Sequence, residues 1–249
     1  MATTALASEW KALSDRLTKA LNLAVRPIFL AFQSERPEGV RQFDAAMSAP
    51  TPDGRTGRVS ASCVFWVEAS RDQGAFVTVP EDHGNCSVGV LVHGFGSLEN
   101  VAGNDDVAAL FASGWVTPEM VPTIPVVSTR PGAITYGRLE AVPAGVDPDV
   151  VMLRVNGRQM MILSDAVPGL RIEGKPQCHI IAVAKEQGVP AASLGCAVSR
   201  ARTGMRPDEM TCAFPAGTFA EIVDQIEATA ATDSVVAKYA ADDARRFST

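Results

Sequence analysis

Hydrophobic positions in the first part of the chain predict a helix, a strand and a long loop. The helix is indicated by apolar residues three and four positions apart, which are Trp10, Leu13, Leu17, Ala20 and Leu21. The apolar run 25–32 contains Pro27, which lacks a backbone N–H and therefore favours an edge or entry strand over a central one. Residues 34–57 are rich in Pro, Gly and Ser, and we expect a loop there that covers a site or a partner surface.

Further along, the hydrophobic pattern alternates between helical and extended periods. The expected elements are a helix at 62–70, a strand at 75–79, a helix that begins after an N-cap at Asn85, a helix from Asn104 to Gly114, β-rich runs at 124–127 and 133–139, a strand at 150–155, helices at 159–166 and 179–187, and strands at 191–195 and 210–214. Such alternation is typical of a sheet covered by helices.

The last predicted helix has a clear start. Thr218 and Glu221 stand at capping-box spacing, and one apolar face follows, formed by Phe219, Ile222, Val223 and Ile226. The tail after Ala230 carries several charges and is expected to be solvated.

Together these elements predict an α/β (α+β mixed) fold, with a mixed sheet and helices packed on it. At 249 residues the chain suits one domain, since single cores stop growing at about 250 to 300 residues. We expect two lobes, approximately 10–117 and 118–230, followed by a tail at 231–249. The sequence itself shows no internal repeat.

The charge composition indicates which kinds of molecule the protein binds. A formal net charge of -6 and a pI near 5.1 argue against nucleic acid or anionic membrane as partners, because both attract clustered Lys and Arg. No basic and apolar leader opens the chain, and no apolar run reaches the roughly 18 residues of a spanning helix. We therefore expect a cytoplasmic protein that acts on a small molecule. A homodimer is a fair default, because two-fold dimers are the commonest soluble oligomers.

Five cysteines are the residues that point to chemistry. They are odd in number and widely spaced, at Cys63, Cys86, Cys178, Cys196 and Cys212. Without an export signal, this pattern is more typical of free thiols or ligands than of a disulfide framework. Cys212 alternates with apolar neighbours in a strand, and Cys63 lies beside Val64, Phe65 and Trp66, so both are expected to pack in the core.

The order of motifs resembles the uncharacterised family called domain of unknown function 169, also known as the archaeal conserved region. The resemblance spans roughly 10–227 and rests on Asn85-Cys86-Ser87-Val88-Gly89, on the strand 149–155 running into Arg158-Gln159-Met160, on Cys178 at a helix start, and on Ser193-Leu194-Gly195-Cys196 followed by Arg200 and Asp208-Glu209-Met210. Ser87 and Val198 stand where compared members tend to have proline and glycine. The resemblance implies an α/β fold with cysteines at matching places, and brings no established reaction.

Three cysteines have a similar predicted setting. Cys86 and Cys178 are expected in first turns of helices, where unpaired N–H groups and the helix dipole favour negative charge. Cys196 follows a strand end, where open α/β sheets collect ligands. Three thiols from three segments could meet there.

Two functional interpretations follow for this trio. In one, the three thiols ligate a metal such as Zn or an iron–sulfur cluster, with His179, His83 or Cys63 as a fourth ligand or with an open position for substrate. In the other, one cysteine is a nucleophile. The chain has no CxxC pair and no HExxH, and a buried cysteine often behaves as a small hydrophobe, so plain packing remains an alternative.

Polar residues near these cysteines complete the candidate site. His83 precedes Cys86 and is a candidate acid, base or ligand, and Glu209 is a candidate general base. Arg200 and Arg202 follow Cys196, and a guanidinium there suits a carboxylate or phosphate; His179 joins them as a candidate substrate contact.

We therefore expect an enzyme of small-molecule metabolism whose pocket is built around the three cysteines. A cysteine-ligated centre acting in hydrolysis or elimination on a small polar or anionic substrate is favoured, since no nucleotide or flavin motif is visible. The alternatives are a Cys nucleophile without metal and a non-catalytic protein that binds a small ligand or a metal. His93 is expected to be a packing residue.

Overall fold

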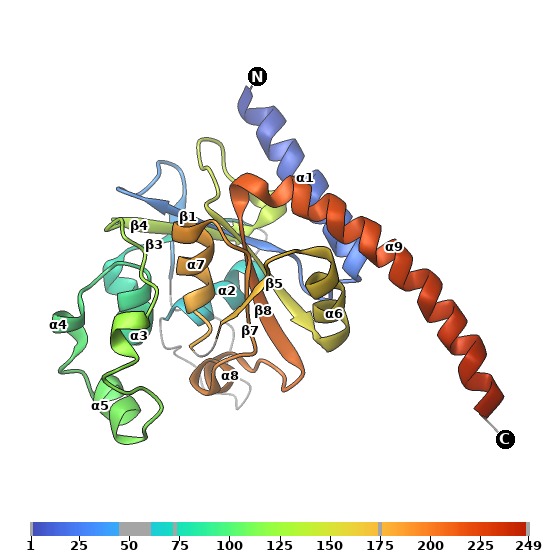
Figure 1. Cartoon of the computed structure of the whole chain (residues 1–249). Coiled ribbons are helices and arrows are strands. Elements are labelled where there is room, and N and C mark those ends of the chain that lie inside the picture. The colour runs from blue at the N-terminus through green and yellow to red at the C-terminus, as the bar shows by residue number, and fades with distance from the viewer. Residues whose placement is uncertain (1, 45–60, 72–73, 174–175, 248–249) are drawn as a thin grey trace.

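An eight-stranded mixed sheet forms the centre of the molecule, with helices on both of its faces (Figure 1). The computed structural model describes residues 2–44, 61–71, 74–173 and 176–247, and the statements below concern those residues. The strands in chain order are β1 (Ile28–Gln33), β2 (Arg41–Gln42), β3 (Phe76–Thr78), β4 (Ala133–Arg138), β5 (Val150–Asn156), β6 (Arg171–Glu173), β7 (Ala191–Ser193) and β8 (Glu209–Pro215).

The two faces of the sheet carry different helices. The helices are α1 (Ala2–Leu21), α2 (Ser62–Arg71), α3 (Ser87–Val92), α4 (Leu98–Val101), α5 (Asp105–Ala112), α6 (Gly157–Ala166), α7 (His179–Gln187), α8 (Ala197–Thr203) and α9 (Phe219–Ala244). One hydrophobic cluster joins α1, α6 and α9 to strand residues such as Phe29, whereas another joins α2 and α7 to residues such as Leu30. Since Phe29 and Leu30 are adjacent in β1, both faces of the sheet are buried.

The topology of the sheet repeats, although the sequence shows no repeat. The strand order is β2-β3-β4-β1-β5-β8-β7-β6, so each half places its four strands in the same relative order. In each half a parallel pair is connected through a helix, α2 between β2 and β3 and α7 between β6 and β7. The other neighbours are antiparallel, including β1 and β5, where the halves meet. The fold therefore consists of two topologically equivalent halves.

The predicted mixed α/β fold is confirmed, and most elements lie where the pattern placed them. The helix at 179–187 has the predicted bounds, and the strand predicted at 210–214 is the core of β8. Strands from both predicted lobes join the one sheet, since β1, β2 and β3 belong to 10–117 and the others to 118–230. The greater part of the predicted covering loop, 45–57, lies outside the described residues.

The prediction that the 25–32 run is an edge or entry strand and not a central one was wrong. β1 is central, paired with β4 on one side and β5 on the other. Pro27 lies one residue before the strand, so its missing N–H removes no ladder bond, while its carbonyl accepts from Leu139 N at 2.9 Å.

Two further predictions need correction. The run 124–127 is not a strand in the described chain, because Pro125 removes a backbone donor from it. The capping box at Thr218 is not formed, since its side chain makes no capping hydrogen bond. The tail after Ala230 is exposed as expected, but it is helical, since α9 continues to Ala244 and its second half projects from the body into solvent (Figure 1). Its exposed apolar side chains there are Val235, Val236 and Tyr239.

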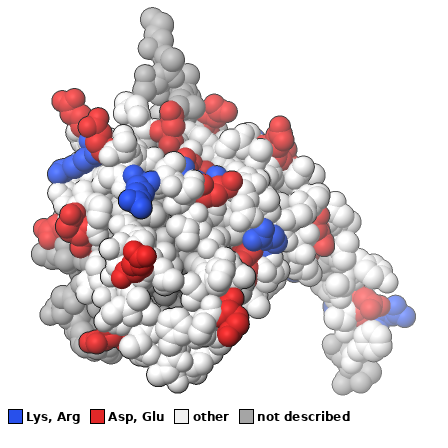
Figure 2. All heavy atoms as spheres, turned by 60° about the vertical axis from the view of Figure 1, so that its left-hand side comes forward, with Lys and Arg blue, Asp and Glu red and all other residues white. Residues whose placement is uncertain are grey.

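Two surface observations bear on partners. On the face shown in Figure 2, Lys and Arg side chains are scattered among Asp and Glu. Among the helices of the described chain, none combines the length and apolar character that a membrane span requires.

Candidate functional site

A pocket on the α2 and α7 side of the sheet brings four cysteines together. Its volume is about 200 Å³, and its wall includes Cys63, Cys86, Cys178 and Cys196. The predicted trio therefore shares one pocket, and Cys63, which the sequence analysis placed in the core with a secondary role as a fourth ligand, joins it. Apart from these thiols the lining is largely apolar and includes Trp66, Val88, Leu110, Trp115 and Val198.

Each of the four cysteines lies at the start of a helix. Cys86, Cys178 and Cys196 are the N-cap residues of α3, α7 and α8, and Cys63 is the second residue of α2. The N-cap of α3 is thus Cys86 and not Asn85, which corrects its predicted place by one residue. None of the three N-cap thiols makes a capping hydrogen bond to its helix.

The four pocket cysteines lie at equivalent positions in the two halves of the fold. Cys63 and Cys178 stand at the starts of α2 and α7, the helices that connect the parallel strand pairs. Cys86 and Cys196 stand at the starts of α3 and α8, which follow β3 and β7. Each half therefore contributes an equivalent pair of thiols to one pocket.

Burial keeps the deeper thiols protonated. Burial, followed by the neighbouring Cys86, raises the pKa of Cys63 to about 11. The pKa of Cys178 lies well above its usual value, first because of burial and then because Cys86, Cys196 and Cys63 are near. Cys212, in β8, lies outside the pocket lining, and burial alone raises its pKa. Cys86 is half-buried, while Cys63, Cys178 and Cys196 are buried.

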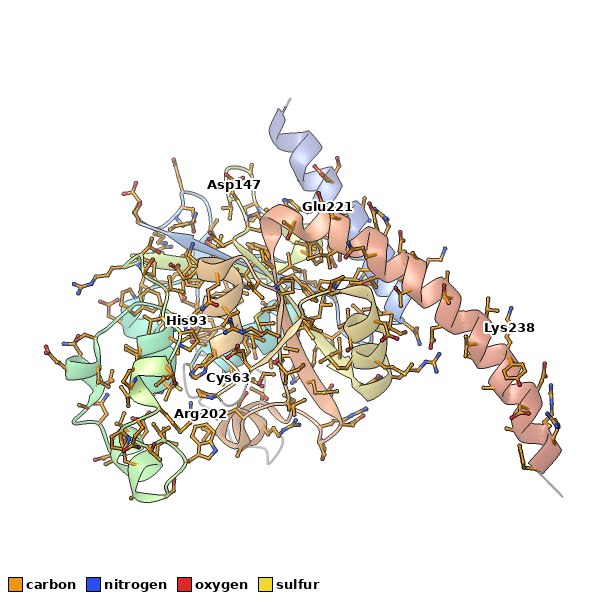
Figure 3. The ribbon with its side chains drawn as sticks, viewed as in Figure 1. Cys63, His93, Asp147, Arg202, Glu221 and Lys238 are labelled. Atoms are coloured by element: carbon orange, nitrogen blue, oxygen red, sulfur yellow. The ribbon has the colours of Figure 1, made fainter. Side chains whose placement is uncertain are left out.

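Arg202 supplies the positive charge in the described wall of the pocket. Burial lowers the pKa of this guanidinium, but the adjacent Cys86 and Cys63 raise it overall. Figure 3 shows Arg202 and Cys63 in the same region, near α8 and α2. The Nη2 group donates to the backbone oxygen of Asn85 at 3.0 Å, whereas Nη1 is buried without a partner among the described atoms.

Gln177 presents a second unsatisfied polar atom in the pocket wall. Its side chain is buried, and Nε2 donates to Ser199 Oγ at 2.5 Å. Its Oε1 is buried and has no partner among the described atoms. Buried polar groups are normally hydrogen-bonded. Arg202 Nη1 is therefore a donor, and Gln177 Oε1 an acceptor, that a bound ligand can satisfy.

A hydrogen-bonded network lies behind the pocket wall. Ser62 Oγ is 3.1 Å from both His83 Nδ1 and His93 Nδ1, and His83 Nε2 is 2.9 Å from Thr78 Oγ1. His93 Nδ1 carries the proton, because the Gly89 oxygen 2.7 Å away can only accept. Burial lowers the pKa of His93 to about 4, and burial followed by the nearby His93 lowers that of His83 well below its usual value. Both imidazoles are neutral at pH 7.

His83 is therefore near Cys86 in sequence but does not line the pocket. It ends a short 3-10 turn, Pro80–His83, and is 1% exposed, and its contact with the pocket wall runs through the Ser62 hydroxyl. The packing role expected for His93 agrees with its complete burial. His179 follows Cys178 and is buried enough to lower its pKa to about 4, but it too is not part of the described lining.

Arg200 and Glu209 lie away from the pocket and hold a loop. Arg200 donates to the backbone oxygens of Leu194 at 2.7 Å and Glu209 at 2.8 Å, and also to that of Arg206. Glu209 Oε2 accepts from Arg206 N at 2.7 Å. Neither Arg200, predicted to bind substrate, nor Glu209, predicted to act as a base, is among the residues that line the pocket. Of the two predicted arginines, Arg202 is the one that lines it.

The arrangement of the thiols in this conformation is not that of a formed metal site. Within the described ranges, no group of three or more His, Cys, Asp or Glu side chains is placed to hold a metal ion. Sequence reasoning also missed Ser62 and Gln177, because an isolated serine or glutamine carries no spacing signal, and only the fold brings them to the pocket.

Comparison with known proteins gives one match. A family model, DUF169, described as uncharacterised ArCR, matches residues 16–225. Neither the curated proteins nor the solved structures contain a match to this chain. The matched span includes the four pocket cysteines and all eight strands.

Proposed function

The chain belongs to the DUF169 family, and we propose that it is an enzyme whose pocket cysteines hold a thiolate-ligated metal centre, either Zn or an iron–sulfur cluster. The centre would act in hydrolysis or elimination on a small polar or anionic substrate. The observation that carries this proposal is the convergence of Cys63, Cys86, Cys178 and Cys196 on one pocket from two equivalent halves of the fold.

The chemistry of cysteine favours a metal centre bound by these thiols over four thiols that act independently. Soft ligands such as cysteine sulfur select zinc and iron–sulfur clusters, and these centres take up to four cysteines. Four ionised thiolates around one small pocket would repel one another strongly, and burial followed by this repulsion raises the pKa values of Cys63 and Cys178. A bound cation reverses it, because metal binding displaces the thiol protons.

The proposal requires the thiols to turn toward one metal centre. A cysteine side chain has one rotatable bond, χ1, and turning it moves the sulfur without moving the helix. Because the N-cap sulfurs are not engaged in capping bonds, their rotation breaks no hydrogen bond of this kind. Three thiols would suffice as ligands, which leaves one position for substrate.

The second candidate is a cysteine nucleophile without metal. Cys86 favours it, since this thiol is the half-buried one of the four and has Arg202 beside it. A guanidinium offers a counter-charge to a thiolate formed during reaction. The buried Ser62 and His83 pair does not contact this thiol in any hydrogen bond described above, so a general base would have to come from the substrate or solvent.

Metal and acid-labile sulfide analysis of protein purified without air tests the proposal. Stoichiometric zinc, or iron with matching sulfide, is expected in the wild type, together with loss of most of it in Cys86→Ser, Cys178→Ser and Cys196→Ser. Cys212→Ala is the matched control, because Cys212 is buried in β8 outside the pocket. Metal content that is nil in the wild type, or equal in all four variants, would exclude the metal centre and leave the nucleophile.

A measurement of substrate turnover then distinguishes an enzyme from a protein that only binds its ligand. A non-catalytic protein with the same centre would saturate with ligand without consuming it. Because the proposal requires reduced thiols, it also places the protein in a reducing compartment such as the cytoplasm.

A further inference from the structure

We propose that the pocket binds a small hydroxy-carboxylate with a branched or short apolar body, its carboxylate on Arg202 and its hydroxyl on Gln177. This inference names the substrate class of the thiol pocket and in that respect rests on the proposed function. Its basis is different, however, since it depends on two unsatisfied polar atoms and on the apolar lining rather than on the cysteines.

The anionic group is assigned by Arg202. Arg202 lines the pocket, and its Nη1 is buried and lacks a partner among the described atoms, whereas Nη2 donates to the Asn85 oxygen. A buried guanidinium N–H without an acceptor is costly, and a carboxylate is the acceptor that its planar geometry fits best.

The single negative side chain in the described wall does not fill this role. Asp106 also lines the pocket, but its oxygens accept from Ser87 N at 2.9 Å and from Ser87 Oγ at 2.6 Å. The carboxylate of Asp106 is thus committed to the start of α3, and the charge of Arg202 is left for a ligand.

The hydroxyl is assigned by Gln177. Because Nε2 is used by Ser199, the unpartnered Oε1 is an acceptor, and its ligand must bring an O–H or N–H donor. An acid without a donor would leave Oε1 buried and unsatisfied. Sites built to bond a hydroxyl reject analogues that lack it, for this reason.

The rest of the ligand is limited by size and polarity. A pocket of about 200 Å³ has room for a compact acid. The wall facing that space includes Trp66, Leu110 and Trp115, which favour an apolar body. One guanidinium among apolar groups suits a monoanion, whereas phosphate prefers several donors.

Calorimetric titration of the purified protein with four probes tests the inference. Leucate is the hydroxy acid, isocaproate is the same acid without the hydroxyl, isocaproamide lacks the charge, and inorganic phosphate is the alternative anion. We expect leucate to bind most tightly, isocaproate roughly tenfold more weakly, and the amide and phosphate not measurably. Arg202→Gln should weaken leucate by roughly 10-fold to 100-fold, and Gln177→Leu should abolish the preference of leucate over isocaproate.

Arg206→Gln is the matched control, since this exposed arginine pairs with Asp208 outside the pocket. A melting curve for each variant checks folding, and Arg202→Lys, which keeps the charge, should retain part of the affinity. The inference is overturned if Arg202→Gln and Arg206→Gln bind leucate equally well, or if the amide binds as tightly as the acid.

The metal content of the wild type, measured together with leucate binding, separates this inference from the proposed function. Arg202-dependent leucate binding by a wild type without metal would keep the inference and exclude the metal centre. A metal-loaded protein that binds none of the probes would keep the metal centre and exclude the hydroxy acid.

Discussion

Cys86 and Cys196 occupy the same position in the two halves of the fold, each as the residue that immediately precedes a helix after an equivalent strand. They are 110 positions apart in the sequence, the difference between 196 and 86. Both line the pocket, yet Cys86 is half-buried and Cys196 is buried. The equivalence of the halves is therefore one of topology and not of environment, which makes the individual thiols distinguishable by experiment.

Thiol alkylation of the native, metal-free protein should follow exposure and thiolate content. Iodoacetamide is expected to modify Cys86 first, whereas Cys178 should react at least tenfold more slowly because it is buried and its pKa is strongly raised. Peptide mass spectrometry over a time course measures each rate. Cys212, fully buried in β8, is the internal reference for an unreactive thiol. Equal rates at Cys86 and Cys178 would show that the pocket is more open than the structure indicates.

Alkaline destabilisation should depend on Cys63. Its pKa rises from 9.0 to about 11 on folding, so the folded state holds this proton more tightly and gains stability that is complete below pH 9 and is lost as the pH rises through 11. Two pKa units correspond to about 2 to 3 kcal/mol. Urea unfolding of the wild type and of Cys63→Ala at pH 8 and pH 11 measures this difference, and the variant should lose less stability. Parallel losses would mean that other groups cause the decline.

Acid destabilisation should depend on His93. Its pKa falls from 6.5 to about 4 because the ring is buried, so it contributes stability that is present above pH 6.5 and is lost as the pH falls through 4. The full effect is about 3 kcal/mol. His93→Gln, which can still donate to the Gly89 oxygen, should flatten the decline in unfolding free energy between pH 6.5 and 4. A variant that declines as steeply as the wild type would contradict this assignment.

Removal of the Ser62 hydroxyl should destabilise the protein through the histidines. Ser62→Ala deprives His83 Nδ1 of its partner at 3.1 Å and leaves it buried and unsatisfied, which costs about 1 to 3 kcal/mol. Ser70→Ala is the matched control on the same helix, since its hydroxyl donates to the Val67 oxygen in the last turn of α2. Chemical denaturation should give a loss for Ser62→Ala that exceeds that of Ser70→Ala. Indistinguishable losses would show that the network contributes no stability.

The loop before α8 should not tolerate a side chain at Gly195. Its φ is +116°, a region available essentially to glycine alone, and an added Cβ would stand 2.6 Å from Arg200 Nη2. Arg200 cannot yield easily, because it is held by backbone oxygens of Leu194 and Glu209. Gly195→Ala should therefore cost about 2 kcal/mol or more.

Gly188→Ala is the control for this effect. Gly188 has φ +64°, with nothing within 4 Å of an added Cβ, so it carries only the left-handed cost of about 1 to 2 kcal/mol. Thermal melting of the two variants side by side measures the difference. A milder effect at Gly195 than at Gly188 would contradict the role given to Arg200.

Helices and strands could be predicted from the sequence where they depend on neighbouring residues alone. The apolar periodicity of α7, the Gly at the end of that helix and the proline punctuation between strands depend only on neighbours along the chain. Local pattern did not predict the central place of β1, because Pro27 disturbs a sheet only if it lies within the hydrogen-bonded part of the strand. It failed for the end of α9, because a projecting helix has no core to mark where it stops.

The candidate site was only half determined by the sequence. Cysteines before helices could be recognised one at a time, but their common pocket, and the inclusion of Cys63, follow from the equivalence of two halves that share a strand order and no visible repeat. The choice between Arg200 and Arg202 shows the limit most clearly. Two residues apart on a helix, they point about 200° apart, so one arginine holds a loop and the other enters the pocket. The sequence shows their spacing, whereas only the packing of α8 against α2 decides which side of the helix faces the thiols.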